Sequence, residues 1–184
     1  MNESKEEMSK SLIAEAPTER LRTFGDPVLK EQTRPVTEFD AALEALVKTM
    51  FAVMEREDGV GLAAPQIGVL KRVAVWRHPE NENERYVLVN PRIVERSEAC
   101  SVGSEGCLSV PEVTVDVERP DEVVVEAQDV TGSIYQMHLT GLLARIVQHE
   151  IDHLDGCLIL DRASAEERRR VLRALRERSL ASQP

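Results

Sequence analysis

The chain has 184 residues, of which 42% are hydrophobic and 30% are charged, and its formal net charge is −10. This length suits one domain with its own core, and the negative charge argues against nucleic-acid binding through the whole surface. No run of about 18 apolar residues is present, so the sequence predicts no membrane-spanning helix and no membrane partner.

The first 19 residues are rich in charge and poor in large apolar side chains, so we expect a mobile arm at 1–19. They also lack the apolar stretch of a secretory signal peptide. Together with three cysteines, an odd number for a disulfide-bonded protein, this predicts a reducing, cytoplasmic location.

An amphipathic helix is expected next along the chain. Thr37 and Asp40 resemble a variant capping box at its start, and Gly59 marks the point before which it should end. Apolar side chains recur at the spacing of one helix face, namely at Leu43, Leu46, Val47, Met50 and Met54.

The middle of the chain contains short runs typical of β-strands. Turn residues at Asn90-Pro91, Arg119-Pro120 and Thr131-Gly132 separate several of them, which indicates antiparallel meanders. The expected strands cover 72–76, 85–89, 92–95, 113–117, 122–127 and 134–139.

Two helices are expected after the strands. One covers about 142–154 and stops at Gly156, which suits a left-handed C-terminal cap. Ser164 and Glu167 form a capping box for a last helix that extends to about Arg178. This order of elements predicts an α+β fold, with antiparallel sheets packed around the helix at 142–154 and further helices near the N- and C-termini.

The segment QHEIDHLDG, at 148–156, carries the H-E-x-x-H pattern inside the expected helix. His149 and His153 are four residues apart, so both imidazoles leave the same helix face and can hold one metal ion. Glu150 lies beside them, where it can handle a proton.

The residues around this pattern argue against a chance pair of surface histidines. Leu142, Ile146 and Ile151 are expected to bury the helix, and neutral imidazoles without partners would be costly there. The segment therefore favours a metal site.

A catalytic site of the zinc type needs three protein ligands and an open position for water. A metzincin protease would supply a histidine ten residues after His149, where this chain has Ile159. The glutamates at 166–167 are expected to be exposed and are poor candidates. Cys107, in EGCLS at 105–109, offers a thiolate, which divalent transition metals bind well.

A third stretch, GVGLAAPQ, occupies 59–66. Gly59 and Gly61 would let another backbone approach closely, as an added strand from an extended peptide does. Gln66 offers an amide that can stabilise a carbonyl oxygen as it becomes negative. On this stretch alone, a simple turn and a surface glutamine remain open.

GVGLAAPQ, EGCLS and QHEIDHLDG, in this order, resemble the three motifs of the peptide deformylase family without a departure at any motif position. The resemblance extends over about 21–161, includes FGDPVL at 24–29, and assigns a catalytic domain to 20–162. It implies a metal-dependent hydrolase that removes the formyl group from N-formylmethionyl nascent peptides and releases formate.

The resemblance also implies roles for individual residues. Cys107, His149 and His153 would bind one divalent metal, first of all Fe²⁺, with Zn²⁺, Ni²⁺ or Co²⁺ as other occupants. Glu150 would act as general base and acid, and the Leu108 N–H and the Gln66 side chain would stabilise the oxyanion. The expected substrate-binding residues are Gly59, Val60, Gly61, Gly106, Leu142 and Ile146.

Two other classes of function remain open. An HExxH peptidase would cleave internal peptide bonds of unblocked substrates. A silent metal-dependent binding module would keep the ligands without turnover, although Glu150 and an open fourth position count against a purely structural site.

The C-terminal segment differs electrically from the rest of the chain. Residues 162–184 hold seven arginines and three glutamates, a net charge of +4, so that −14 remains for 1–161. We expect a basic helix and tail over 163–184, with a short apolar stripe at Val171, Leu172 and Leu175. Such a face is commonly a solvated surface, and docking to ribosomal RNA or protein is the alternative.

Overall fold

The computed structural model describes residues 20–181, so the arm expected at 1–19 lies outside the described residues. Its helices are α2 (Ala41–Arg56), α3 (Gly141–Leu154), α4 (Ile159–Arg162) and α5 (Ala165–Ala181), with 3₁₀ turns η1 (Pro27–Lys30) and η2 (Ala64–Ile67). Its strands are β1 (Gly61–Ala63), β2 (Val73–His78), β3 (Asn81–Arg96), β4 (Cys100–Cys107), β5 (Val110–Pro120), β6 (Glu122–Gln128) and β7 (Ile134–Thr140). Within the described part of the chain, no helix is long and apolar enough to cross a membrane.

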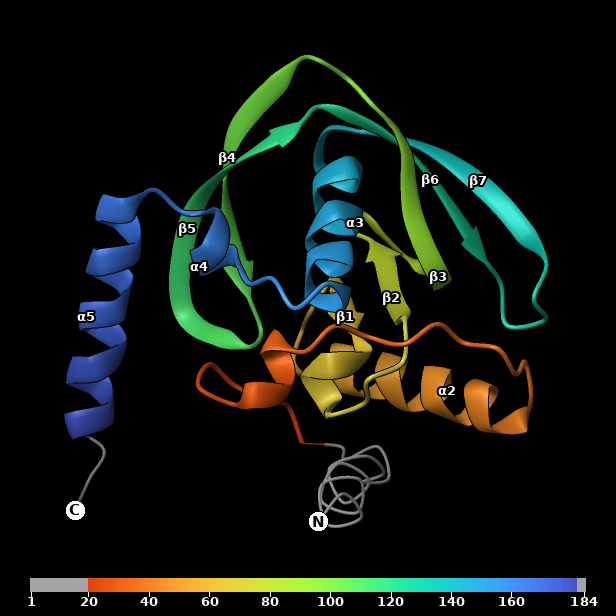
Figure 1. Cartoon of the computed structure of the whole chain (residues 1–184), viewed down its shortest axis with the longest axis horizontal. Helices are drawn as coiled ribbons and strands as arrows, with labels where there is room; N and C mark the ends of the chain where they lie inside the picture. The colour runs from red at the N-terminus through yellow and green to blue at the C-terminus, as the bar shows by residue number, and fades with distance from the viewer. Residues whose placement is uncertain (1–19, 182–184) are drawn as a thin grey trace, which may run out of the picture.

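The strands form two antiparallel sheets that surround α3 (Figure 1). The larger sheet has the order β1-β2-β3-β6-β7, and the smaller one consists of β4 and β5. Helix α3 contacts strands of both sheets, whereas α2 packs against β1 and β2. The expectation of an α+β fold with antiparallel sheets around the HExxH helix is confirmed.

The β1–β2 end of the larger sheet is covered on both faces, and β2 shows why. Val73 and Val75 point into the apolar cluster that includes α2. Ala74 and Trp76 point into the cluster that includes α3. Side chains alternate across a strand, so a strand between two helix layers must be apolar at every position, as Val-Ala-Val-Trp is here.

The start of α2 differs from the expected capping box. Asp40 alone is the N-cap, and its carboxylate accepts a hydrogen bond from the Leu43 N–H over 3.0 Å. Thr37 is exposed and lies outside the helix, three residues before the cap. The helix ends at Arg56, before Gly59, as expected.

The turn expected at Asn90-Pro91 is wrong, because β3 continues through it from Asn81 to Arg96. Asn90 has a φ of 52° and the register with β6 shifts beside it, so the pair forms a bulge. The Asn90 side chain hydrogen-bonds the N–H and C=O of Val36, at 2.8 and 2.9 Å, and thereby holds this bulge in place.

Two strands were not expected from the sequence. β1 lies in the glycine-containing GVGL stretch, and β4 begins at Cys100 and ends at Cys107. The Thr131-Gly132 turn is confirmed between β6 and β7, with Gly132 at φ 87°. Arg119-Pro120 ends β5, and the chain passes there from the smaller sheet to β6 of the larger one.

Helix α5 lies beside β5, on the side of the smaller sheet away from α3 (Figure 1). Ser164 caps its start, since the Ser164 Oγ accepts a hydrogen bond from the Glu167 N–H over 3.1 Å. The stripe expected at Val171, Leu172 and Leu175 packs against an apolar cluster of the smaller sheet, and Val171 is fully buried. The stripe is therefore part of the core rather than of the surface.

Two glycines at the ends of α3 allow a matched stability test. Gly156 adopts φ 72°, which confirms the left-handed cap, and an added Cβ would lie 2.5 Å from the Lys30 carbonyl oxygen. Gly141 adopts φ 56° with nothing within 4 Å of an added Cβ. We expect Gly141→Ala to lower the free energy of unfolding by about 1 kcal/mol, and Gly156→Ala by about 3 kcal/mol because a clash adds to backbone strain.

Urea denaturation of the two variants measures both losses. Equal losses would show that the contact with Lys30 relaxes at no cost.

Candidate active site

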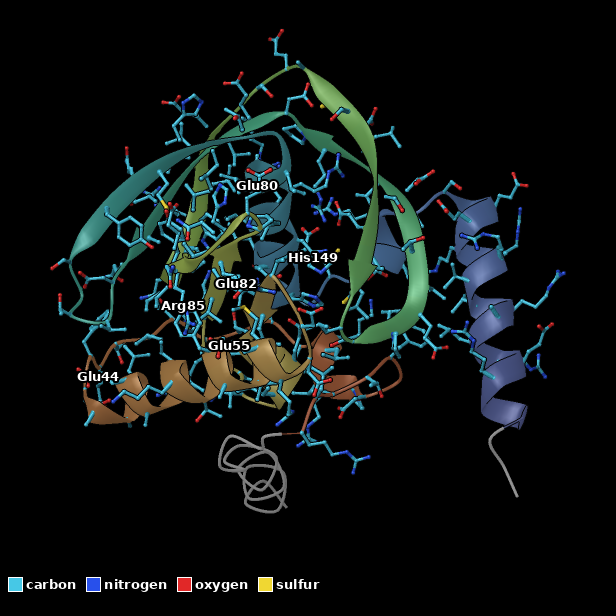
Figure 2. All side chains as sticks on the ribbon, turned by 180° about the vertical axis from the view of Figure 1, so that it is seen from behind. Glu44, Glu55, Glu80, Glu82, Arg85 and His149 are labelled. Atoms are coloured by element: carbon cyan, nitrogen blue, oxygen red, sulfur yellow. The ribbon has the colours of Figure 1, made fainter. Side chains whose placement is uncertain are left out.

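Three potential metal ligands meet between the smaller sheet and α3. Cys107 ends β4, and His149 and His153 lie one turn apart on α3. The Cys107 Sγ is 3.3 Å from the His153 Nε2, which is 3.2 Å from the His149 Nε2. The three ligand atoms all lie within 4.8 Å of one another, and Figure 2 shows His149 on the side of α3 that faces β4 and β5.

The residues at this point fit a bound metal ion. Their donor set of one thiolate and two imidazoles is one that iron and zinc both accept. Glu150 is 4% exposed, and its Oε2 has no hydrogen-bond partner among the described residues. A buried carboxylate oxygen without a partner is unfavourable unless something else binds there, such as a metal-associated water.

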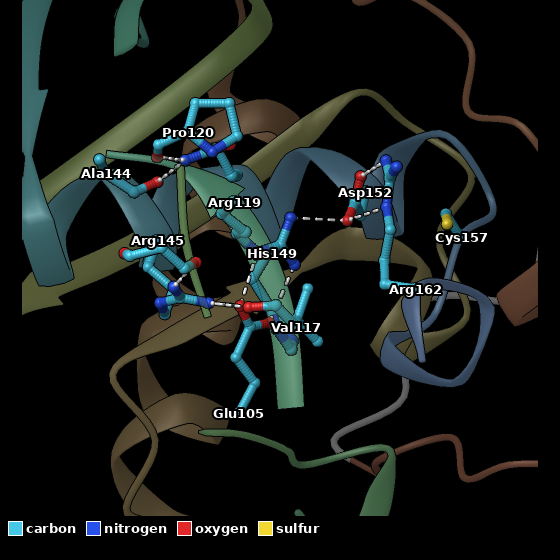
Figure 3. A network of polar contacts seen from close by, with 12 residues as sticks. Glu105, Val117, Arg119, Pro120, Ala144, Arg145, His149, Asp152, Cys157 and Arg162 are labelled. Carbon is cyan, nitrogen blue, oxygen red and sulfur yellow. Dashed lines mark hydrogen bonds and ion pairs between the residues drawn. The ribbon is translucent and has the colours of Figure 1, made fainter. Parts of the chain in front are cut away.

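Glu105 orients one of the histidines. Its carboxylate is buried and is 3.0 Å from the His149 Nδ1 (Figure 3). Two hydrogen bonds from Arg119, at 2.5 and 2.9 Å, and one from Arg145, at 2.8 Å, hold it there. An ionised carboxylate only accepts hydrogen bonds, so the His149 Nδ1 donates, and in the neutral imidazole that binds a metal the lone pair of Nε2 faces Cys107 and His153.

The charge of Glu105 is maintained in the interior by these partners. Burial by itself raises the pKa of this carboxyl, but hydrogen bonds from Arg119 and His149 outweigh it and lower the pKa from 4.5 to about 2. The group is therefore an anion throughout the neutral range.

A second carboxylate extends the network away from the ligands. The Arg119 Nη1 lies 2.9 Å from the Asp152 Oδ2, and Arg162 contacts both oxygens of Asp152 at 2.6 and 3.1 Å (Figure 3). The buried Arg119 thus lies between two carboxylates, and α4 is tied to α3 through Arg162.

Sequence reasoning missed this network. Glu105 and Asp152 lie within the recognised motifs EGCLS and QHEIDHLDG, which was the available signal, but neither residue received a role. Arg119 has the sequence context of a turn and Arg145 gives no local signal, because the partners of both lie far away in the sequence.

Two glycines fit closely against side chains of the site, Gly61 against Glu150 and Gly59 against Leu108. An added Cβ on Gly61 would lie 2.3 Å from the Glu150 Oε1, and one on Gly59 would lie 2.8 Å from the Leu108 Cδ1. Both glycines therefore make room for side chains of the site itself, a reason that differs from the approach of a peptide backbone. Burial is the main cause that raises the pKa of Glu150 from 4.5 to about 7, against the opposing charges of His149 and Arg119.

A cavity of about 620 Å³ opens beside the three ligands. Leu142 lines it and is 59% exposed, so the expectation that Leu142 is buried is wrong: it stands in the first turn of α3, facing the cavity. Ile146 and Ile151 are buried as expected. The other expected site residues that line the cavity are Gly59, Val60, Gly61, Gln66, Gly106, Cys107, Leu108, Ile146, His149 and Glu150, whereas His153 is buried and is not part of the lining.

Gln66 is buried rather than on the surface. Its Oε1 accepts a hydrogen bond from the Ala63 N–H over 2.8 Å, and its Nε2 donates to the Ser109 Oγ over 3.1 Å. These bonds fix the orientation of the amide and use one of its two N–H groups. The second N–H can donate a hydrogen bond to a ligand in the cavity.

Comparisons with known proteins agree on one family. The family model described as polypeptide deformylase matches residues 18–169. The peptide deformylase of Thermotoga neapolitana is 44% identical over 149 residues, 81% of this chain and 89% of the relative. The peptide deformylase of Acidobacterium capsulatum is 46% identical over 162 residues, 87% of this chain and 95% of the relative.

Solved structures give the same result. A peptide deformylase from Legionella pneumophila superposes with a TM-score of 0.82 at 38% identity, over 90% of this chain and 98% of that one. A peptide deformylase from Synechococcus elongatus, in complex with actinonin, also reaches 0.82 at 37% identity, over 91% of each chain.

Substitution of two cysteines, one at a time, tests the proposed ligand set. We expect Cys107→Ala to lower the bound metal well below one ion per chain, because one of three ligands is lost. Cys100→Ala is the matched control, since Cys100 is exposed and lies outside the cluster of ligands. Metal analysis of purified protein after dialysis measures both; equal metal content in the two variants would require a different third ligand.

Proposed function

Because this chain belongs to the polypeptide deformylase family, we propose that it hydrolyses the N-formyl group of N-formylmethionine on newly synthesised polypeptides and releases formate. The observation that carries the proposal is the meeting of three ligand atoms beside one cavity with a Glu150 oxygen that has no hydrogen-bond partner in the described part of the chain.

Cys107, His149 and His153 would hold the metal, with Fe²⁺ as our first candidate and Zn²⁺, Ni²⁺ or Co²⁺ as alternatives. When bound, such an ion lowers the pKa of a coordinated water and polarises the formyl oxygen. Glu105 keeps His149 in the tautomer that this role requires.

Glu150 would carry the proton. Its carboxylate is buried beside the ligands, and this burial raises its pKa above the ordinary value, which suits a group that both accepts and releases a proton. In this mechanism it takes the proton of the attacking water and delivers it to the amine of methionine, which must be protonated in order to leave.

Gln66 and Leu108 would stabilise the negative charge that develops on the formyl oxygen. Both line the cavity, and the hydrogen bonds of Gln66 to Ala63 and Ser109 hold its amide in place before substrate binds. Donors that are already oriented need no reorganisation during the reaction.

The remaining cavity residues would bind the peptide. β1 is an edge strand of the larger sheet, so the backbone around Gly61 offers one side for an extended peptide to pair with. Val60, Leu142 and Ile146 provide apolar surface for the methionine side chain, and Gly106 lines the same cavity.

Formate release tests this function and separates it from the alternatives. We expect anaerobically prepared protein to release formate from formyl-Met-Ala-Ser and to leave acetylated and unblocked peptides intact. Cleavage of unblocked peptides would favour an HExxH peptidase, and metal binding without turnover would favour a silent binding module.

Glu150→Gln should keep the metal and lower turnover by at least about 100-fold, because an amide cannot accept the proton of water. Gly61→Ala should also lower turnover, because the added Cβ would displace the Glu150 side chain while leaving its carboxylate chemically intact. Near-normal rates in a fully metal-loaded Glu150→Gln variant would remove Glu150 from the proposed role.

We also propose that the basic face of α5 docks on the ribosome, near the point where nascent chains emerge. The proposal is supported by the charge of +4 on residues 162–184 and by exposed arginines such as Arg169 and Arg173. Removal of the whole helix is an unsuitable test, because Val171 belongs to the core.

Reversal of two surface charges is the sharper experiment. Arg169→Glu with Arg173→Glu should weaken co-sedimentation with ribosomes at low salt and leave hydrolysis of formyl-Met-Ala-Ser nearly unchanged. If the unmodified protein fails to co-sediment even at low salt, the face is an ordinary solvated surface.

A further inference from the structure

Part of the cavity wall is a bulge in β5. Cys107 pairs with Val110 and Gly106 pairs with Thr114, so the residues Pro111–Val113 are left out of the ladder between β4 and β5. Glu112 at its centre adopts φ 61°, a left-handed conformation unusual for a residue other than glycine. All three residues line the cavity that Cys107 and Glu150 also line.

A bulge of this kind needs support from outside the ladder, because its backbone groups have lost their strand partners. Helix α5 provides it. The Arg178 Nη1 lies 3.1 Å from the Glu112 Oε2 and 3.5 Å from the Pro111 carbonyl oxygen. Arg170 donates to the Thr114 carbonyl oxygen over 3.3 Å, directly after the bulge.

The apolar side of α5 packs against the smaller sheet, which carries this part of the cavity wall. Val171 is fully buried in one cluster with Cys107, Val110 and Val115, and Leu175 packs against it. Figure 1 shows the smaller sheet between α5 and α3, so α5 backs the strands whose other side faces the ligand-bearing helix.

We infer that α5 positions one wall of the substrate cavity, with Arg178 as the positioning residue that holds the Pro111–Val113 bulge. The inference rests on the proposed function for its kinetic consequence. β1 of the larger sheet and the bulge of the smaller sheet border one cavity, so a peptide on the β1 edge has the bulge nearby. Displacement of the bulge then weakens peptide binding and leaves the proton transfer at Glu150 unchanged.

Charge reversal tests the inference through KM and kcat separately. An exposed ion pair contributes about 0.2–1 kcal/mol, so we expect Arg178→Glu to raise KM for formyl-Met-Ala-Ser by up to about five-fold, with kcat unchanged. Glu112→Arg should act in the same way. The double variant, Arg178→Glu with Glu112→Arg, restores the attraction and should return KM toward the original value.

Arg176→Glu is the matched control, because it makes the same charge change near the same end of α5, on an exposed side chain. A KM for Arg178→Glu equal to that of Arg176→Glu, or no recovery in the double variant, would overturn the inference. A fall in kcat together with a lower unfolding temperature would overturn it as well, because it would show general destabilisation.

Hydrogen exchange gives a readout that does not depend on activity. Amides of residues 112–114 should exchange faster in Arg178→Glu than in Arg176→Glu, and equal rates would contradict the positioning role. If the unmodified protein releases no formate, the proposed function fails, while the exchange rates still decide whether Arg178 holds the bulge.

Discussion

The site depends on the contacts that the buried Glu105 carboxylate makes. Glu105 belongs to β4, and its partners Arg119, Arg145 and His149 belong to β5 and α3. Removal of one partner from a buried ion pair leaves an uncompensated charge, which costs roughly 3–5 kcal/mol. The smaller sheet and α3 are therefore held together at the point where Cys107, at the end of β4, must meet the two histidines of α3.

The same constraint explains why small residues line the junction. The Arg145 side chain crosses to β4 so closely that a Cβ on Gly103 would lie 2.8 Å from its guanidinium carbon. Gly61, in β1 of the larger sheet, makes the corresponding room for Glu150. Glycines at these positions let the helix lie against both sheets, and residues of both sheets and of α3 line the cavity. Any larger side chain would move a charged group that the site uses.

The sequence predicted what local periodicity and spacing can encode. Helical spacing placed His149 and His153 on one face, and the left-handed cap at Gly156 followed from its position after the last apolar residue. The chain did not reveal β4, because CSVGSEGC has few β-branched residues and its pairing with β5 is set by contacts elsewhere. Asn90-Pro91 has the composition of a turn, yet contacts with Val36, more than 50 residues away, keep it within a strand. Long-range partners of this kind leave no periodic signal.

Helix α5 shows how one element can serve the fold and the site with different faces. Its apolar stripe completes the cluster that contains Cys107, and Arg170 and Arg178 turn toward the bulge, while Arg169 and Arg173 face solvent. The arginines of this segment therefore do not form one uniform basic surface, because some of them bind other parts of the same chain. A ribosome that binds the exposed arginines would thereby bind α5, and α5 also contacts the cavity wall. Docking and peptide binding would then share one helix, and coupling between them would need no change in the ligands or in Glu150.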